Sequence, residues 1–302
     1  SDLIKKLKAK IIKTANSNSS VLIEGETGCG KELVAHSIHD LSKRTSNPFI
    51  KVNCAAIPKD LIESELFGYE YGAFTGAKKG GKIGKFEMAD KGSIFLDEIN
   101  QLSHILQPKL LRTLQEREIE RIGSEKSIPV DVRIIAATNI PLEKMVKDGT
   151  FRSDLFYRLN VIKIKIPPLR ERKEDIPLIV KDAIQRLNFQ LGMHISKVAD
   201  EVNSRLMDYD WPGNIRELKN ITEYIINVIE ERDLMITVKH LPPKLTNSLN
   251  IKEIKTLAEI EKEAIETLLL KYGRSSKDKV KVAETLDISL ATLYRKLKLY
   301  NL

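Results

Sequence analysis

The chain has 302 residues, of which 42% are hydrophobic and 6% aromatic, and its formal net charge is +8. This length fits two or three domains, and the composition favours a globular, helix-rich protein over a disordered one. No run approaches the roughly 18 apolar residues of a membrane span, so no membrane partner is expected. The N-terminal residues form no signal peptide, and the two cysteines match no metal-ligand spacing, which indicates a cytoplasmic setting.

Short runs rich in Ile, Val or Phe alternate with helical patterns through the first half of the chain. This alternation predicts the α/β class, with a mostly parallel sheet covered by helices on both faces. The expected strands are 21–25, 49–53, 93–97, 133–138 and 161–166, and the expected helices include 31–41 and 107–116.

A glycine-rich segment, GETGCGKE, follows the first expected strand and opens a helix. In this context the backbone N–H groups cradle phosphates and the lysine reaches the outer phosphates, although a glycine-rich turn without a ligand is the alternative. Position 32 is Glu, where most such loops place a Ser or Thr that binds magnesium. The candidate nucleotide-binding residues are Gly25, Glu26, Thr27, Gly28, Cys29, Gly30, Lys31 and Glu32.

A second glycine-containing segment places a short apolar tip between Gly72 and Gly76. Glycine permits backbone angles that other residues resist, so the segment is expected to be a hinged loop with Phe74 at its tip. The alternative is an ordinary surface turn whose Phe packs into the core.

Polar side chains follow two of the expected strands. Asp97 and Glu98 end the strand SIFLD, where Asp97 can hold Mg²⁺ and Glu98 can polarise an attacking water. Asn139 follows RIIAAT, from where it can orient that water. Taken alone, the paired acids fit a solvated helix start and Asn139 fits a turn.

Arg152 and Arg158 are six residues apart, too far for a contact between helical neighbours. An arginine is needed where charge develops on a transferring phosphoryl group, and it is often supplied by a neighbouring molecule. Two surface salt bridges are the alternative reading of this pair.

From Pro167 onward the strand signal fades and a small helical domain is expected. Residues 175–191 show an amphipathic period with Gly192 as a stop, and Asn214 and Glu217 suggest a capping box. Arg216 then lies in the first turn of a helix, where a cation is unfavourable to the helix dipole, which suggests a phosphate partner.

The C-terminal end carries the charge surplus, with eight Lys or Arg against three Asp or Glu in residues 271–302. The apolar positions between 254 and 269 predict a helix with a dimer contact, and residues 282–297 read as helix, tight turn, helix. Leu293 and Leu297 are expected in the core of this domain. The alternative to a DNA-binding domain is a basic exposed helix that does not contact DNA. The candidate DNA contacts are Thr292, Tyr294, Arg295 and Lys296.

Several of these segments together resemble one family. GAFTGA at 72–77, ELFG at 65–68, GSIFLDEI at 92–99, KLLRTLQE at 109–116, FRSDLFYR at 151–158 and WPGNIREL at 211–218 are similar to the motifs of bacterial enhancer-binding proteins, the AAA+ ATPases that activate sigma-54 RNA polymerase. The C-terminal pattern resembles the Fis-type helix-turn-helix. Glu32 after the lysine is also usual in these activators.

The resemblance implies a P-loop sheet subdomain over 1–170, a helical lid over 171–242, a linker at 243–250 and a DNA-binding domain over 251–302. It implies ATP bound by Lys31, Mg²⁺ bound by Asp97, and catalysis by Glu98, with Asn53 as a switch that holds Glu98. Thr138 with Asn139 would be the first sensor and Arg216 the second. Arg152 and Arg158 would reach the ATP of a neighbour in a ring of six or seven subunits.

The implied partners are the sigma-54 RNA polymerase holoenzyme and double-stranded DNA at an upstream enhancer. The resemblance assigns sigma-54 contact to the loop residues Gly72, Ala73, Phe74, Thr75, Gly76 and Ala77. Two other classes stay open, a DNA-binding regulator that uses ATP only as an assembly switch and a helicase or DNA translocase.

Overall fold

The computed structural model describes residues 1–74, 79–230, 233–246, 257–273, 275–300 and 302. The chain divides into two compact units, Ser1–Thr246 and Asn247–Leu302. Within the described residues, no helix combines the length and the apolar character needed to cross a membrane.

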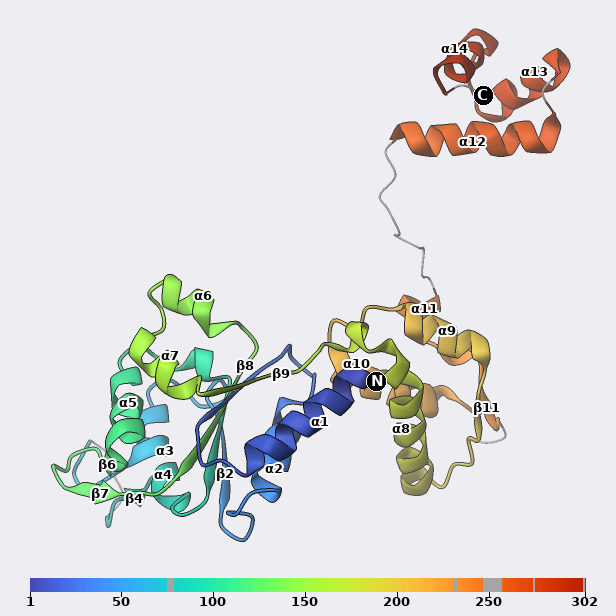
Figure 1. The fold of residues 1–302 in the computed structure, drawn as a ribbon. Coiled ribbons are helices and arrows are strands. Elements are labelled where there is room, and N and C mark those ends of the chain that lie inside the picture. Colours follow the sequence, from blue (N-terminus) through green and yellow to red (C-terminus); the bar gives the residue numbers. More distant parts are fainter. Residues whose placement is uncertain (75–78, 231–232, 247–256, 274, 301) are drawn as a thin grey trace. The chain divides into compact units, whose positions relative to one another are not determined.

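A parallel sheet of five strands forms the centre of the first unit, in the order β2-β5-β8-β1-β9. All five strands match the sequence prediction, so the predicted α/β fold is confirmed (Figure 1). The strands are β1 (Val21–Glu24), β2 (Phe49–Asn53), β5 (Ser93–Asp97), β8 (Arg133–Thr138) and β9 (Ile162–Lys165).

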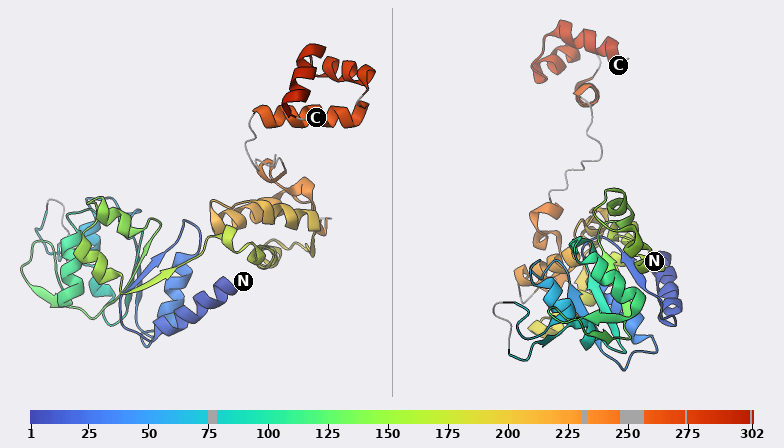
Figure 2. Two further views of the ribbon diagram at one scale, coloured as in Figure 1. Left: turned by 45° about the horizontal axis from the view of Figure 1, so that its top comes forward. Right: turned by 90° about the vertical axis from the view of Figure 1, so that its left-hand side faces the viewer.

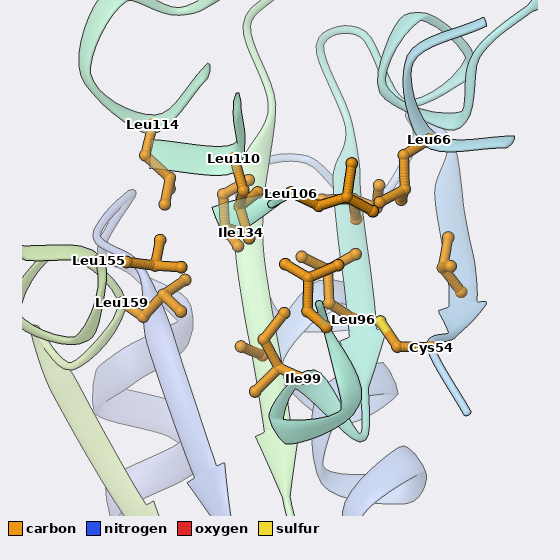
Figure 3. Close-up of a cluster of buried hydrophobic side chains, with 14 of the residues drawn as sticks. Cys54, Leu66, Leu96, Ile99, Leu106, Leu110, Leu114, Ile134, Leu155 and Leu159 are labelled. Carbon is orange, nitrogen blue, oxygen red and sulfur yellow. The ribbon is translucent and has the colours of Figure 1, made fainter. Parts of the chain in front are cut away.

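Helices cover both faces of this sheet, because successive side chains of a strand point to opposite faces. In β8, Ile134 packs into one core cluster and Ile135 into the other. Figure 3 shows the larger cluster, in which Leu114, Leu155 and Leu159 approach Ile134. One face carries α1 (Asp2–Ala15) and α2 (Lys31–Asp40), and the other carries α3 (Ile62–Phe67), α4 (Lys85–Met88), α5 (Gln107–Glu116), α6 (Leu142–Lys147) and α7 (Ser153–Leu159).

Two short hairpins extend from this layer. The first pairs β3 (Gly68–Tyr69) with β4 (Lys82–Ile83), and the second pairs β6 (Glu118–Glu120) with β7 (Ser127–Pro129). The backbone N–H of Glu70, just after β3, donates to the carbonyl of Ile122, which lies in the connection between β6 and β7, so the two hairpins are joined. A single-turn helix, η1 (Ile99–Gln101), follows β5.

A helical lid completes the first unit around a separate core that contains the fully buried Trp211. The helix expected over 175–191 begins at Ile176, and Gly192 ends it in the left-handed conformation, with φ of 68°. The lid contains η2 (Leu169–Glu171), η3 (Lys173–Asp175), α8 (Ile176–Leu191), β10 (Lys197–Val198), α9 (Asp200–Asp208), α10 (Asn214–Val228), β11 (Met235–Ile236), η4 (Val238–His240) and α11 (Pro243–Thr246).

Two expectations for the lid are wrong. The predicted capping box does not form, since the Glu217 carboxylate accepts from the backbone N–H of Gly213, 3.0 Å away, and the Asn214 side chain bonds elsewhere. The expected linker at 243–250 begins with a helix, α11, whose Leu245 is buried in the lid core. Residues 247–250 lie outside the described residues.

The second unit is a three-helix domain of α12 (Leu257–Tyr272), α13 (Ser276–Thr285) and α14 (Leu290–Tyr300). In both views of Figure 2, α13 and α14 lie on the same side of α12. Leu293 and Leu297 are buried between the helices, as predicted. On α12, Ile265 and Leu269 face this core while Ile260 is exposed.

Candidate active site

The glycine-rich segment forms a loop between β1 and α2, as its sequence predicts. All four residues of β1 are buried, which fixes the strand, and Gly30 opens α2 with φ of 103°. Lys31 is only 8% exposed, and its Nζ donates to the carbonyls of Gly25 and Glu26 at 3.0 and 3.3 Å. The ammonium group therefore lies inside the loop, beside the free N–H groups of the first helical turn, an arrangement that suits an anion.

The two acids stand at the end of β5. The Asp97 Oδ1 atom accepts from the backbone N–H of Glu98 at 3.0 Å, and Glu98 has a left-handed backbone with φ of 52°. Such strain in a residue other than glycine is characteristic of functional sites. Asn53 is the strand neighbour of Asp97 on β2, and its side-chain oxygen accepts from the backbone N–H groups of Ala55 and Ala56.

The lid closes the site from the other side. The backbone N–H of Ile215 donates to the carbonyl of Gly28 at 3.1 Å, which holds the start of α10 against the loop. A Cβ atom on Gly28 would lie 2.2 Å from the carbonyl oxygen of Gly213, so only glycine permits this approach. Arg216 is thereby brought into the first helical turn next to the phosphate loop.

These elements enclose a cavity of about 470 Å³, which gathers most of the predicted residues. It also contains Leu33, Ile215, Lys219 and Asn220, which the sequence reasoning missed. Lys219 and Asn220 follow Arg216 by three and four residues, so helical spacing from Arg216 is a signal that would have found them. The predicted residues in its wall are Thr27, Gly28, Gly30, Lys31, Glu32, Asn53, Asp97, Glu98 and Arg216.

Three predicted loop residues lie outside the cavity wall. Gly25 directly follows β1, and Cys29 is 3% exposed within the core cluster beneath the loop, where burial raises the pKa of its thiol. The Glu26 carboxylate accepts from both terminal nitrogens of Arg170, at 2.6 and 2.8 Å, and from Asn214. The hydrogen bond with Arg170 is the main reason that the pKa of Glu26 is lowered.

Asn139 also lies outside the cavity wall, one residue beyond the end of β8. Its side-chain oxygen is buried and has no hydrogen-bond partner among the described residues. The preceding Thr138 donates from its Oγ1 toward the side-chain oxygen of Asn100 at 3.0 Å. A role for Asn139 toward water near Glu98 stays a prediction.

The two candidate arginines do not reach the cavity of their own chain, since Arg152 directly precedes α7 and Arg158 lies in its last turn. Arg152 forms two hydrogen bonds with Asp154, at 2.7 and 3.0 Å. Arg158 is exposed and donates to the carbonyl of Leu114 at the end of α5. The surface salt bridge that was the alternative prediction thus exists for Arg152, whereas Arg158 has no carboxylate partner among the described residues.

Three residues of the 72–77 loop, Gly72, Ala73 and Phe74, are described, and the other three lie outside the described residues. Gly72 has φ of 84° and is exposed. The Phe74 ring is 44% exposed and meets the ring of the buried Tyr69 edge-on, with the centroids 5.0 Å apart. Phe74 is therefore partly packed at the base of the loop and is not a core residue.

The candidate DNA residues lie on α14. The Ser289 hydroxyl accepts from the backbone N–H of Thr292, which caps the start of the helix. Tyr294 and Arg295 are exposed, and Lys279 lies over the Tyr294 ring at 5.2 Å. Lys296 instead forms an ion pair with Glu261, at 2.5 Å, so its charge is partly committed within the domain.

The parallel sheet, the phosphate loop, the acids on the neighbouring strand and the helical lid define a P-loop ATPase fold of the AAA+ class. Residues 1–165 match the sigma-54 interaction domain, residues 170–258 the AAA+ ATPase lid domain and residues 256–300 the bacterial regulatory proteins of the Fis family. The chain belongs to the family defined by the sigma-54 interaction domain.

Two similar proteins carry the names of regulatory proteins. The chain is 46% identical to the signal-transduction and transcriptional-control protein of Clostridium beijerinckii, with 100% of the chain and 48% of that protein aligned. It is 46% identical to regulatory protein AtoC of Escherichia coli K12, with 96% of the chain and 64% of AtoC aligned. The chain thus spans less than two thirds of the length of these curated relatives.

A solved structure shares the whole fold. NtrX from Brucella abortus in complex with ADP aligns with a TM-score of 0.77 at 33% identity, covering 100% of this chain and 69% of NtrX. The ATP complex of the same protein aligns with a TM-score of 0.74.

Proposed function

We propose that this chain hydrolyses ATP in an oligomeric ring and uses the energy to remodel the closed promoter complex of sigma-54 RNA polymerase in the cytoplasm. The observation that carries the proposal is the cavity in which Lys31, Asp97, Glu98 and Arg216 converge from two strand ends and the lid. Membership of the sigma-54 interaction domain family supports the choice of partner.

The residues of the cavity suit the reaction. Lys31 and Arg216 are cations placed to hold phosphates, and Glu98 would take the proton from the attacking water. Asp97 and Glu98 offer hard carboxylate oxygens with no cation partner among the described residues, which fits Mg²⁺. When bound there, Mg²⁺ would neutralise charge on the phosphates. No described cluster holds three metal-ligating side chains, in keeping with an ion that takes its remaining ligands from phosphate and water.

The positions of Arg152 and Arg158 support a ring. A transferring phosphoryl group needs a cation at its outer oxygens, and these two arginines lie away from the cavity of their own chain. We propose that they serve the ATP of a neighbouring copy, so that hydrolysis requires assembly. A ring of six or seven copies would then present as many 72–77 loops to one partner.

The loop supplies the contact with sigma-54. Phe74 rests against Tyr69 with nearly half of its surface exposed, so little has to be broken to release it. We propose that ATP binding raises the loop and that Phe74 and Thr75 then touch sigma-54. The Fis-type domain would hold the assembly on DNA upstream of the promoter, with α14 in the major groove.

Two variants test the proposal with purified protein, sigma-54 holoenzyme and ADP–aluminium fluoride as the transition-state mimic. Phe74→Ala should abolish capture of sigma-54, while ATP hydrolysis falls by much less. Tyr71→Ala is the control, because Tyr71 is 65% exposed beside the loop and outside its motif. Brisk hydrolysis without capture by the unaltered protein would favour an ATP-switched DNA regulator, and DNA-stimulated hydrolysis with strand separation would favour a helicase.

A further inference from the structure

A second cavity, of about 290 Å³, lies at the opposite edge of the sheet from the phosphate loop. Residues 18–20 and residues 130 and 132 help to line it, and they precede β1 and β8 respectively. The cavity is therefore at the amino ends of these parallel strands, whereas the phosphate loop follows the carboxyl end of β1. Its apolar floor includes Leu114 and Ile134 of the cluster in Figure 3.

Two arginines share this cavity. Arg158 donates from Nε and Nη2 to the carbonyl of Leu114, at 3.2 and 3.1 Å, which orients its plane and leaves Nη1 unpaired within the described part of the chain. Arg117 has no side-chain hydrogen bond or ion pair with any described residue. The wall contains no carboxylate, and Ser19 and Ser20 add hydroxyl donors. Such a set of donors suits an oxyanion.

The backbone of Arg117 adds an independent observation. Arg117 ends α5 in the left-handed conformation, with φ of 57° and ψ of 37°, and its N–H donates to the carbonyl of Thr113. Glycine is the residue that favours this position, because any Cβ atom strains it. An arginine here therefore opposes local stability, so the local backbone does not account for the choice of this residue.

We infer that this cavity binds a phosphate oxygen of the nucleotide held by a neighbouring copy, with Arg117 as a second cation beside Arg158. The inference rests on the proposed ring. The carbonyl of Leu114 orients the guanidinium of Arg158, and Arg117 adds a second positive charge from the end of α5. Together they would hold the outer phosphate as negative charge shifts during hydrolysis.

The first test is Arg117→Gly, compared with Lys91→Gly. Lys91 is also an exposed cation with a left-handed backbone, at φ of 61°, but it does not line the cavity. Both variants relieve backbone strain, so the melting temperature of each should equal or exceed that of the unaltered protein. At saturating protein concentration, Arg117→Gly should lower kcat about 10- to 100-fold, whereas Lys91→Gly should not change it.

The second test asks whether Arg117 acts on the neighbour. Glu98→Gln copies should bind ATP without hydrolysing it, and they still supply Arg117. A mixture of Glu98→Gln and Arg117→Gly copies should therefore hydrolyse ATP faster than the sum of the rates of the two variants measured separately. The Arg117→Gly protein should also bind ADP–aluminium fluoride more weakly but ADP equally well. Weaker assembly with either nucleotide would mean that the anion is a neighbour's carboxylate, and the inference would be wrong.

The outcomes separate the inference from the proposed ring. If Arg158→Ala abolishes hydrolysis while Arg117→Gly keeps kcat within twofold, the ring stands and the role of Arg117 is refuted. If hydrolysis does not rise with protein concentration and Arg158→Ala is fully active, the ring and this inference both fail.

Discussion

The carboxylate of Glu26 and the guanidinium of Arg170 form a two-bonded ion pair, at 2.6 and 2.8 Å, between residues 144 positions apart. Glu26 is the second residue of the phosphate loop, and Arg170 lies at the start of the lid. Asn214 adds a bond from α10 to the same carboxylate. The pair therefore links the position of the lid to the shape of the loop.

Arg170→Gln should loosen this link and weaken nucleotide binding severalfold. Both side chains are about 40% exposed, so the pair should add little to the free energy of unfolding. Urea unfolding of Arg170→Gln, Glu26→Gln and the double variant measures the coupling. Arg186→Gln, which breaks the exposed pair with Asp182, is the control and should leave nucleotide affinity unchanged.

The pair should also give a pH dependence. The folded-state pKa of Glu26 is below its usual 4.5, so its contribution is complete above pH 4.5 and is lost as the pH falls through the folded value. The free energies of unfolding of the unaltered protein and of Glu26→Gln should therefore become equal as the pH falls below the folded-state pKa of Glu26. A stability difference that stayed constant from pH 6 to pH 3 would contradict this role of the carboxylate.

Gly28→Ala should separate the lid from the phosphate loop. The added Cβ atom would lie 2.2 Å from the Gly213 carbonyl oxygen and 3.0 Å from the Arg216 Cβ atom, so α10 must shift and take Arg216 with it. A fluorescent nucleotide titration should show affinity lowered by tenfold or more. Gly149→Ala has a similar backbone strain, costing about 1 kcal/mol, but no neighbour within 4 Å, so it should lower stability without changing affinity.

The sheet and much of the site were predictable because their signals are local. The central strands β1, β5 and β8 are buried on both faces and read as short apolar runs. Asp97 lies at the carboxyl end of β5, at the same edge of the sheet as the phosphate loop. The helical spacing from Arg216 would also have given Lys219 and Asn220.

The contacts that the sequence did not predict join distant residues. Asn214 and Glu217 have the spacing of a capping box, but the Asn214 side chain accepts from the backbone N–H of Leu169 and donates to the phosphate loop. A local pattern carries no information about such partners. For the same reason the sequence could not distinguish Lys296, paired with Glu261, from the exposed Arg295.

Arg295→Ala should reduce the salt dependence of DNA binding. If the exposed guanidinium neutralises one phosphate, its loss should lower the slope of log affinity against log salt by about 0.9. Lys296→Ala should change the slope less, because Glu261 competes for that ammonium group. Lys271→Ala, on α12, is the control, and equal slopes for all three variants would refute α14 as the DNA-binding helix.

Both thiols should resist alkylation in the folded protein. Cys29 and Cys54 are 3% and 4% exposed, and burial, with Asp97 and Glu98 nearby, raises the pKa of Cys54 to about 12. Thiolate is the reactive form, so iodoacetamide at pH 8 should modify each thiol only as fast as the structure opens. Rapid alkylation of Cys29 that ATP prevents would show that the phosphate loop opens in solution.

The stability of the protein should also decline in alkali. Because the pKa of Cys54 is higher in the folded than in the unfolded protein, its contribution to stability is complete below pH 9 and declines towards pH 12. Cys54→Ala should remove that decline.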